Sequence, residues 1–124
     1  MHSLVRVLAL VVACAGASFA AGCKPQIGDS CKLSTDCSVT GDRLCDTSQP
    51  DGYCTIFNCE PGSCPGNSTC VSFHPKSERF ERRFCLAMCG EPSDCRSGYV
   101  CIEPSKRDAR IVDSVSEHDT VCLP

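Results

Sequence analysis

The sequence predicts a small disulfide-rich fold made of three tandem four-cysteine units with short β-hairpins and little helix. First, 14 of the 124 residues are Cys, a density typical of short exported chains that are cross-linked by disulfides. Second, the last twelve cysteines fall into three groups of four with similar spacing, which indicates one structural unit used three times. Third, a chain of this size with so many cysteines and no Trp does not rely on a hydrophobic core alone.

Residues 1–22 are expected to be a signal peptide. Arg6 is followed by an uncharged, mostly apolar stretch from residue 7 to residue 21, which ends in small residues. This stretch is shorter than the roughly 20 apolar residues that a transmembrane helix needs. We therefore expect the protein to be exported.

The residues Ala-Ala-Gly-Cys at 20–23 resemble the lipobox of bacterial lipoproteins, which predicts a lipid on Cys23. Two alternatives are a signal peptidase site at Ser-Phe-Ala (18–20), which would give a secreted protein, and a lipobox at Val-Val-Ala-Cys (11–14). Lipidation of Cys23 leaves twelve cysteines to pair, whereas both alternatives leave an odd number. Parity therefore favours Cys23, with residues 23–30 as anchor and tether. Lys24 follows, rather than the Asp that retains enteric lipoproteins at the inner membrane, which indicates the outer membrane.

The three units are expected at residues 31–54, 59–85 and 89–122. Within them the cysteines are separated by 5, 7 and 8 residues, then 4, 5 and 14, then 5, 5 and 20, so only the last interval grows. Each third-to-fourth interval predicts a β-hairpin, because strand-forming residues flank both cysteines and turn-forming residues lie between them. The turn is clearest at Gln-Pro-Asp-Gly, 49–52. The polar insertion at 105–119 could carry one helical turn.

If each unit closes on itself, its four cysteines can pair in three ways. We favour the crossed pattern, first to third and second to fourth, because it ties the hairpin to the preceding loop at two points. The expected bonds are Cys31–Cys45, Cys37–Cys54, Cys59–Cys70, Cys64–Cys85, Cys89–Cys101 and Cys95–Cys122.

Two cysteine-rich stretches carry a resemblance beyond this pattern. Ser-Asp-Cys-Arg-Ser-Gly-Tyr-Val-Cys at 93–101 and Cys-Pro-Gly-Asn-Ser-Thr-Cys at 64–70, together with the motif at 20–23, resemble the small cysteine-rich lipoproteins of myxobacteria. They resemble more loosely the cystine modules of EGF-like and Dickkopf-type proteins. The resemblance implies an extracytoplasmic address and a disulfide-rich fold, and it implies no activity.

Several functional classes are disfavoured by the inventory of residues. The formal net charge is −3 with no block of five like charges, so no nucleic-acid partner is expected. Outside the leader the histidines are His74 and His118, and no Gly-x-Ser-x-Gly motif or unpaired cysteine supplies a nucleophile, so no enzyme is expected. Only Cys59/Cys64 and Cys85/Cys89 approach the spacing of zinc ligands, so no metal or other cofactor is expected.

The sequence therefore predicts a non-enzymatic, lipid-anchored extracytoplasmic module of the cell envelope that binds a protein or a glycan of unknown identity and contacts the membrane through its anchor. The alternative is a secreted, disulfide-rich protease inhibitor. Braced loops lose little entropy on binding, and Lys76, Arg79, Arg82 and Arg83 in the second hairpin would offer basic residues to a trypsin-like protease.

Overall fold

A computed structural model describes residues 24–113 and 119–124. The expected signal peptide, Cys23 and His118 lie outside the described residues. Within the described ranges, no helix is long and apolar enough to cross a membrane.

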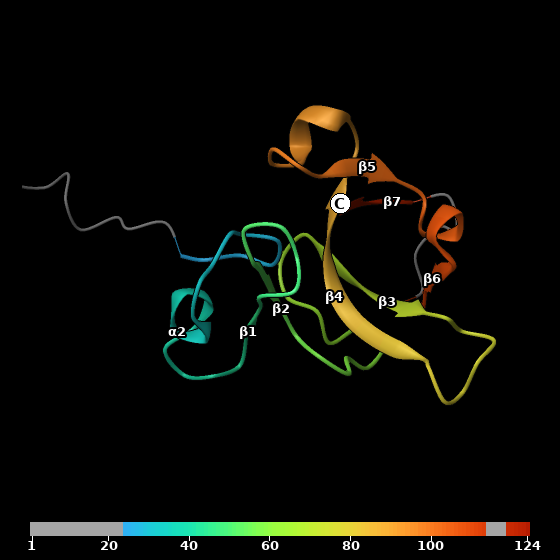
Figure 1. The fold of residues 1–124 in the computed structure, drawn as a ribbon, viewed down its shortest axis with the longest axis horizontal. Coiled ribbons are helices and arrows are strands. Elements are labelled where there is room, and N and C mark those ends of the chain that lie inside the picture. The colour runs from blue at the N-terminus through green and yellow to red at the C-terminus, as the bar shows by residue number, and fades with distance from the viewer. Residues whose placement is uncertain (1–23, 114–118) are drawn as a thin grey trace, which may run out of the picture.

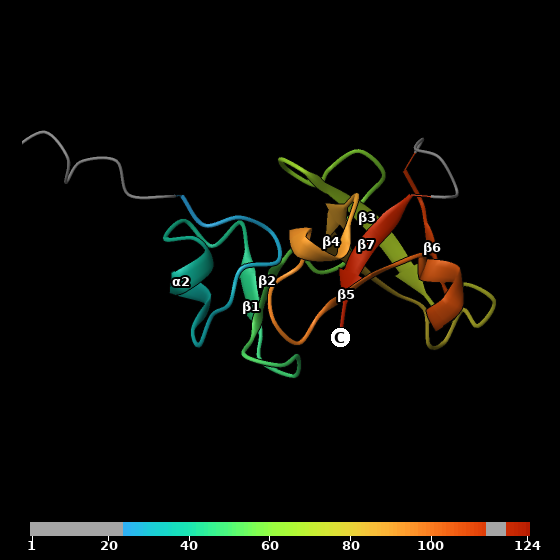
Figure 2. The ribbon, with the colours of Figure 1, turned by 90° about the horizontal axis from the view of Figure 1, so that it is seen from above.

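The described residues form two antiparallel sheets and three very short helices (Figures 1 and 2). The first sheet pairs β1 (Leu44–Asp46) with β2 (Tyr53–Thr55). The second has the order β5-β7-β4-β3-β6, in which the strands are β3 (Ser68–Phe73), β4 (Arg82–Cys89), β5 (Val100–Ile102), β6 (Ala109–Ile111) and β7 (Thr120–Leu123). The helices are α2 (Ser34–Cys37) and two 3-10 helices, η1 (Pro92–Asp94) and η2 (Pro104–Arg107). The predicted small disulfide-rich fold with hairpins and little helix is confirmed.

All three expected hairpins are present, and each has the same register at its cysteines. The third and fourth cysteines of each unit lie directly opposite one another: Cys45 and Cys54, Cys70 and Cys85, Cys101 and Cys122. These opposed cysteines are not bonded to each other. Each is bonded instead to a cysteine of the preceding loop, so both strands of every hairpin are tied to that loop.

The six disulfides of the structure join the same pairs as the crossed pattern. They are Cys31–Cys45, Cys37–Cys54, Cys59–Cys70, Cys64–Cys85, Cys89–Cys101 and Cys95–Cys122. Their Cα–Cα distances run from 5.4 to 5.9 Å, within the usual range for this bond. Every bond therefore lies inside one four-cysteine group.

The loop between the first two cysteines of each group is folded by the residue that precedes the second cysteine. Asp36 accepts hydrogen bonds from the backbone N–H groups three and four residues earlier, both at 2.9 Å. Asp94 accepts the equivalent pair at 3.0 and 2.8 Å, and the Ser63 hydroxyl accepts one from the N–H three residues earlier at 3.0 Å. Such local bonds favour turns, which explains the Asp-Cys dipeptides in the first and third groups.

The second and third groups share one sheet, which the sequence did not predict. The insertion expected to hold at most a helical turn contains η2 and also strand β6, which pairs with β3 of the second group. In the linker between the first two groups, the Ile56 carbonyl accepts from the Cys85 N–H at 3.1 Å and the Asn58 N–H donates to the Arg83 carbonyl at 2.8 Å. These pairings give the backbone N–H and C=O groups of the linker hydrogen-bond partners within the protein.

The expected tether at residues 23–30 is too long. Ile27 is buried in the core, the Gly28 N–H donates to the Cys54 carbonyl, and the Cys54 N–H donates to the Asp29 carbonyl, both at 2.9 Å. Burial of Ile27 and these backbone hydrogen bonds hold residues 27–29 against strand β2. The packed body therefore begins at Ile27 rather than at Cys31.

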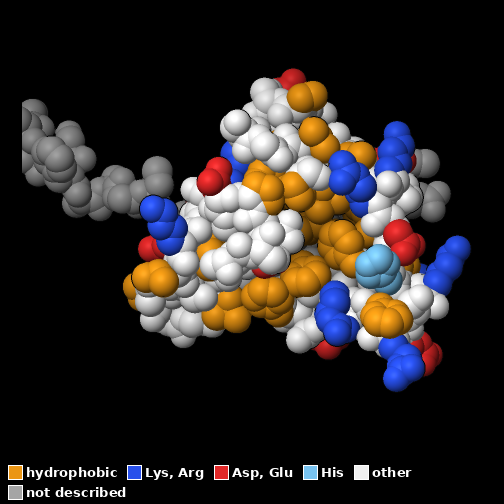
Figure 3. Space-filling view, in the orientation of Figure 1, with side chains coloured by type: hydrophobic (Ala, Val, Ile, Leu, Met, Phe, Trp, Pro, Cys, Tyr) orange, Lys and Arg blue, Asp and Glu red, His pale blue; other side chains and the backbone are white. Residues whose placement is uncertain are grey.

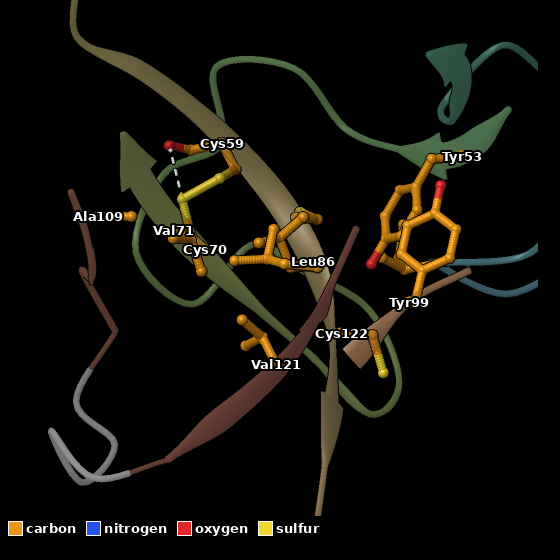
Figure 4. Packing of buried hydrophobic residues seen from close by; sticks show 12 residues of the cluster. Tyr53, Cys59, Cys70, Val71, Leu86, Tyr99, Ala109, Val121 and Cys122 are labelled. Carbon is orange, nitrogen blue, oxygen red and sulfur yellow. Dashed lines mark hydrogen bonds between the residues drawn. A yellow bond between two sulfur atoms is a disulfide. The ribbon is translucent and has the colours of Figure 1, made fainter. Parts of the chain in front are cut away.

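The core is small and rich in cystine. The larger cluster gathers aliphatic, aromatic and cystine side chains, and Figure 4 shows Leu86 and Val121 together with the neighbouring rings of Tyr53 and Tyr99. The smaller cluster consists of Cys31, Cys37 and Cys54 in the first group. With so little aliphatic surface buried, cross-links supply stability that a larger core would otherwise provide.

Candidate functional site

Strand β4 separates the disulfides from an apolar surface. Successive side chains of a strand point to opposite faces, so Cys85 and Cys89 lie on one face while Phe84 and Leu86 lie on the other. Across the hairpin, Phe73 is opposite Arg82 and shares the face of Phe84. One face of the sheet is therefore cross-linked and the other carries large apolar side chains.

This second face borders a groove of about 330 Å³ to which all three cysteine groups contribute. Figure 3 shows hydrophobic side chains in the hollow near the centre of the molecule, with basic side chains and a histidine around it. The apolar lining residues come from several strands and loops: Tyr53, Phe73, Phe84, Leu86, Tyr99 and Leu123. Phe73 and Phe84 meet nearly edge to face, with ring centroids 5.8 Å apart, a favourable aromatic geometry.

The polar groups on the floor of the groove are bonded within the protein. The Tyr53 hydroxyl accepts from the Ala87 N–H at 2.9 Å, and the Thr55 hydroxyl donates to the Cys85 carbonyl at 2.7 Å. The Tyr99 hydroxyl lies 2.9 Å from the Pro50 carbonyl, to which it donates. The floor therefore offers a ligand mainly hydrocarbon and aromatic surface.

Burial of the two tyrosines affects their ionisation. Burial raises the pKa of Tyr53 to about 12, against the opposing effect of the Ala87 N–H. Burial also raises the pKa of Tyr99, and the neighbouring Arg96 guanidinium offsets part of that effect. Both side chains are thus neutral at physiological pH and act as apolar walls.

Basic side chains stand at the rim of the groove. Arg82 donates from Nη1 to the Glu81 carbonyl at 2.8 Å, and Arg107 donates from Nη1 to the Pro124 carbonyl at 2.9 Å. Among the described residues each guanidinium makes this one hydrogen bond, out of the five N–H donors that it carries. The rim can therefore supply several further N–H donors to an anionic group.

The rim also carries His74 and Asp46. His74 Nδ1 lies 2.8 Å from a carboxylate oxygen of Asp108, and both side chains are more than half exposed. Asp46 accepts from the N–H and the hydroxyl of Ser48, at 3.0 and 2.5 Å. Its negative charge lies at the end of β1, next to the turn of the first hairpin.

Arg96 holds the first group against the third and so shapes one wall. Its guanidinium donates to the carbonyls of Gly28 at 2.9 Å, Pro50 at 3.2 Å and Gly52. It also lies 4.2 Å from the ring centroid of Tyr99, within reach of a cation–π interaction. Because Tyr53 and Tyr99 are 5.5 Å apart between centroids, Arg96 positions the two aromatic walls together.

The basic residues singled out in the second hairpin are distributed over different environments. Lys76 and Arg79 are exposed in the loop, whereas Arg82 and Arg83 belong to β4. The loop is folded by turns, since the Phe80 N–H and the Glu81 N–H both donate to the Ser77 carbonyl. Among these four side chains, Arg82 lines the groove.

The cysteines with zinc-like spacing, Cys59, Cys64, Cys85 and Cys89, are all in disulfides. A disulfide sulfur is not the thiolate that zinc binds.

The sequence did not point to the groove. In the sequence, Tyr53, Phe84 and Leu123 are ordinary strand-forming residues beside the fourth cysteines. The sequence feature that could have indicated the groove is the aromatic residue before the fourth cysteine in the first two groups. Flanking residues project to the face that the cysteine leaves free.

The groove and the six cross-links define a small disulfide-rich protein with a pre-formed apolar site. Comparisons with protein-family models, curated proteins and solved structures give no significant match. Six disulfides in so short a chain are typical of extracytoplasmic proteins.

Proposed function

We propose that the protein is a non-enzymatic binding module of the cell envelope, held at the outer membrane by a lipid on Cys23. The observation that carries this proposal is the apolar groove, which all three cross-linked groups build together. Disulfides restrict the movement of its walls, and a pre-formed site loses little conformational entropy on binding. The disulfides support an extracytoplasmic partner, because they persist in oxidising compartments.

The position of the first packed residue supports an anchor that holds the body close to the membrane. Residues 24–26 separate Cys23 from the buried Ile27, a span of roughly 10 Å when extended. In both ribbon views, β6 and the loop at 74–81 lie at the end away from the blue N-terminal segment (Figures 1 and 2). An anchor on Cys23 would thus leave that end of the protein free for a partner.

The chemistry of the rim supports binding rather than catalysis. His74 is paired with Asp108 in an exposed position, where solvent screens the interaction. The hydroxyls on the floor of the groove are occupied by internal hydrogen bonds.

The inhibitor alternative has weaker support. Arg82 and Arg83 are paired in the sheet with Phe73 and Ser72, so their backbone is not free to enter a protease cleft.

The anchor is tested by Cys23→Ser, with Cys14→Ser as the matched control because Cys14 belongs to the other candidate lipobox. Cys23→Ser should move the protein from the membrane fraction to the soluble fraction or block its maturation, and Cys14→Ser should leave it membrane-bound. Intact mass of the extracted protein should show the acyl chains on Cys23. Normal processing and membrane retention of the Cys23→Ser variant would refute the anchor.

A further inference from the structure

The chemistry of the groove specifies a class of ligand, an inference that rests on the binding function proposed above. We propose that the groove binds a medium-chain fatty-acid anion. The alkyl chain lies against the aromatic and aliphatic floor, and the carboxylate lies at Arg82 and Arg107.

The floor favours an alkyl chain over a sugar or a peptide backbone. The side chains of Phe84, Leu86 and Leu123 line it, and the hydroxyls of Tyr53 and Tyr99 are already bonded to backbone groups. A ligand with many hydroxyl or amide groups would lose its hydrogen bonds to water without replacing them, which is costly. A hydrocarbon chain gains free energy from the same burial.

The volume of the groove restricts the size of the ligand. About 330 Å³ is near the lower end of the roughly 300–1,000 Å³ that small-molecule sites span. Such a volume suits one alkyl chain of medium length better than a large polycyclic or multi-chain lipid.

The rim supplies the charge complementarity. Arg82 and Arg107 both line the groove, and each keeps N–H donors beyond the one that bonds to a backbone carbonyl. Guanidinium groups bind carboxylates with paired, charge-assisted hydrogen bonds. Asp46 also lines the groove, on the first hairpin, so the lining contains two guanidinium groups and one side-chain carboxylate. The two guanidinium groups therefore predict that the head group is an anion.

The protein carries a built-in reporter for this site. It has two tyrosines and no tryptophan, and both Tyr53 and Tyr99 line the groove. Intrinsic tyrosine fluorescence therefore monitors occupation of the groove without an added label.

The test uses the oxidised mature chain carrying Cys23→Ser, so that no attached lipid competes for the groove. Decanoate, 1-decanol and decyltrimethylammonium are titrated below their aggregation concentrations while tyrosine emission is recorded. Decanoate should cause a saturable change in emission at lower concentration than decanol, and the cation should bind most weakly. The Arg82→Gln/Arg107→Gln double variant should weaken decanoate binding by about tenfold or more and leave decanol binding unchanged.

Arg79→Gln is the matched control, because Arg79 is exposed on the neighbouring loop and is not part of the groove lining. This variant should bind decanoate like the parent chain. Equal affinity for decanoate and decanol, or equal decanoate affinity in the double variant and the parent, would overturn recognition of the carboxylate. The absence of any saturable change with all three probes would overturn the amphiphile site itself.

Failure of this inference is distinguishable from failure of the anchor. If Cys23→Ser releases the protein but decanoate does not bind, the anchored module stands and the ligand class is wrong. If decanoate binds but Cys23→Ser stays in the membrane fraction, the ligand class stands and the anchor is wrong.

Discussion

Replacement of Arg96 by methionine should loosen the first cysteine group from the rest of the protein. Arg96 belongs to the third group, yet its guanidinium donates to the backbone carbonyls of Pro50 and Gly52 in the first group and of Gly28 just before it. It also stacks over the Tyr99 ring at 4.2 Å. Methionine keeps much of the aliphatic stem but removes every donor and the positive charge.

The expected loss follows from these contacts. A hydrogen bond from a charged donor contributes about 1.5–3 kcal/mol, and an exposed cation–π contact contributes about 0.5–1 kcal/mol. The contributions are not additive, because Arg96 is only half-buried and water can reach the freed carbonyls. We therefore expect the free energy of unfolding to fall by about 3 kcal/mol, which is below the simple sum of about 5–10 kcal/mol. Such a loss is a large part of the roughly 5–15 kcal/mol that stabilises a typical small protein.

The assay is guanidinium chloride unfolding with all disulfides intact, followed by near-ultraviolet circular dichroism of the two tyrosines. Arg79→Met is the control, since Arg79 is exposed on the loop between β3 and β4, and it should cost less than about 0.5 kcal/mol. Hydrogen exchange gives a second measurement: the Gly28 and Cys54 amides, which bond in the first group, should exchange faster in Arg96→Met. A loss below about 1 kcal/mol, or equal to that of the control, would refute the assigned role of Arg96.

Three other predictions follow from single contacts. Burial raises the pKa of Asp113, but hydrogen bonds from the Thr69 hydroxyl and two backbone N–H groups outweigh burial and lower it. Asp113→Asn should therefore cost about 1 kcal/mol at pH 7. This difference should vanish as the pH falls from the ordinary pKa of about 4 through the lowered pKa, and a difference that persists at pH 2 would contradict the assignment. Gly52→Ala places a methyl group against the Cys31 carbonyl, whereas a methyl group at Gly62, which also has positive φ, meets open space. The midpoint of thermal unfolding of the Gly52→Ala variant should therefore be well below that of the Gly62→Ala variant. Equal midpoints would count against the clash. Trypsin should cleave the native protein first after Arg79, as peptide mass mapping would show, because this residue is exposed outside the strands; a first cut inside β4 would contradict the strand assignment.

The cysteine spacing by itself determined the cross-linked framework. Each disulfide joins residues 11 to 27 positions apart, and each hairpin closes around a turn such as the one at 49–52. Interactions between residues this close in the sequence can be recognised from the cysteine spacing, the turn residues and the strand-forming residues beside each cysteine. Hairpin positions could therefore be predicted from the order of residues, whereas the crossed pairing was the favoured one of the three pairings that each group allows.

The tertiary structure alone decided how the groups assemble. Strand β6 is three residues long and lies in a polar insertion, so its pairing with β3 has no periodic signal in the sequence. Arg96 reaches Gly28 across 68 positions, and Asp113 reaches Gly62 across 51. Contacts at such separations depend on how the sheet twists and on which backbone groups remain unpaired, and neither is encoded in a local pattern.

The groove could not be predicted from the sequence for the same reason. Its walls come from β2, β3, β4, β7 and the loop before β5, and each wall residue looks in sequence like an ordinary strand former. Cysteine positions determined which face of each strand was cross-linked, and alternation then left the apolar side chains on the other face. Only the assembly of the two sheets decided that these faces meet in one cavity with Arg82 and Arg107 at its rim.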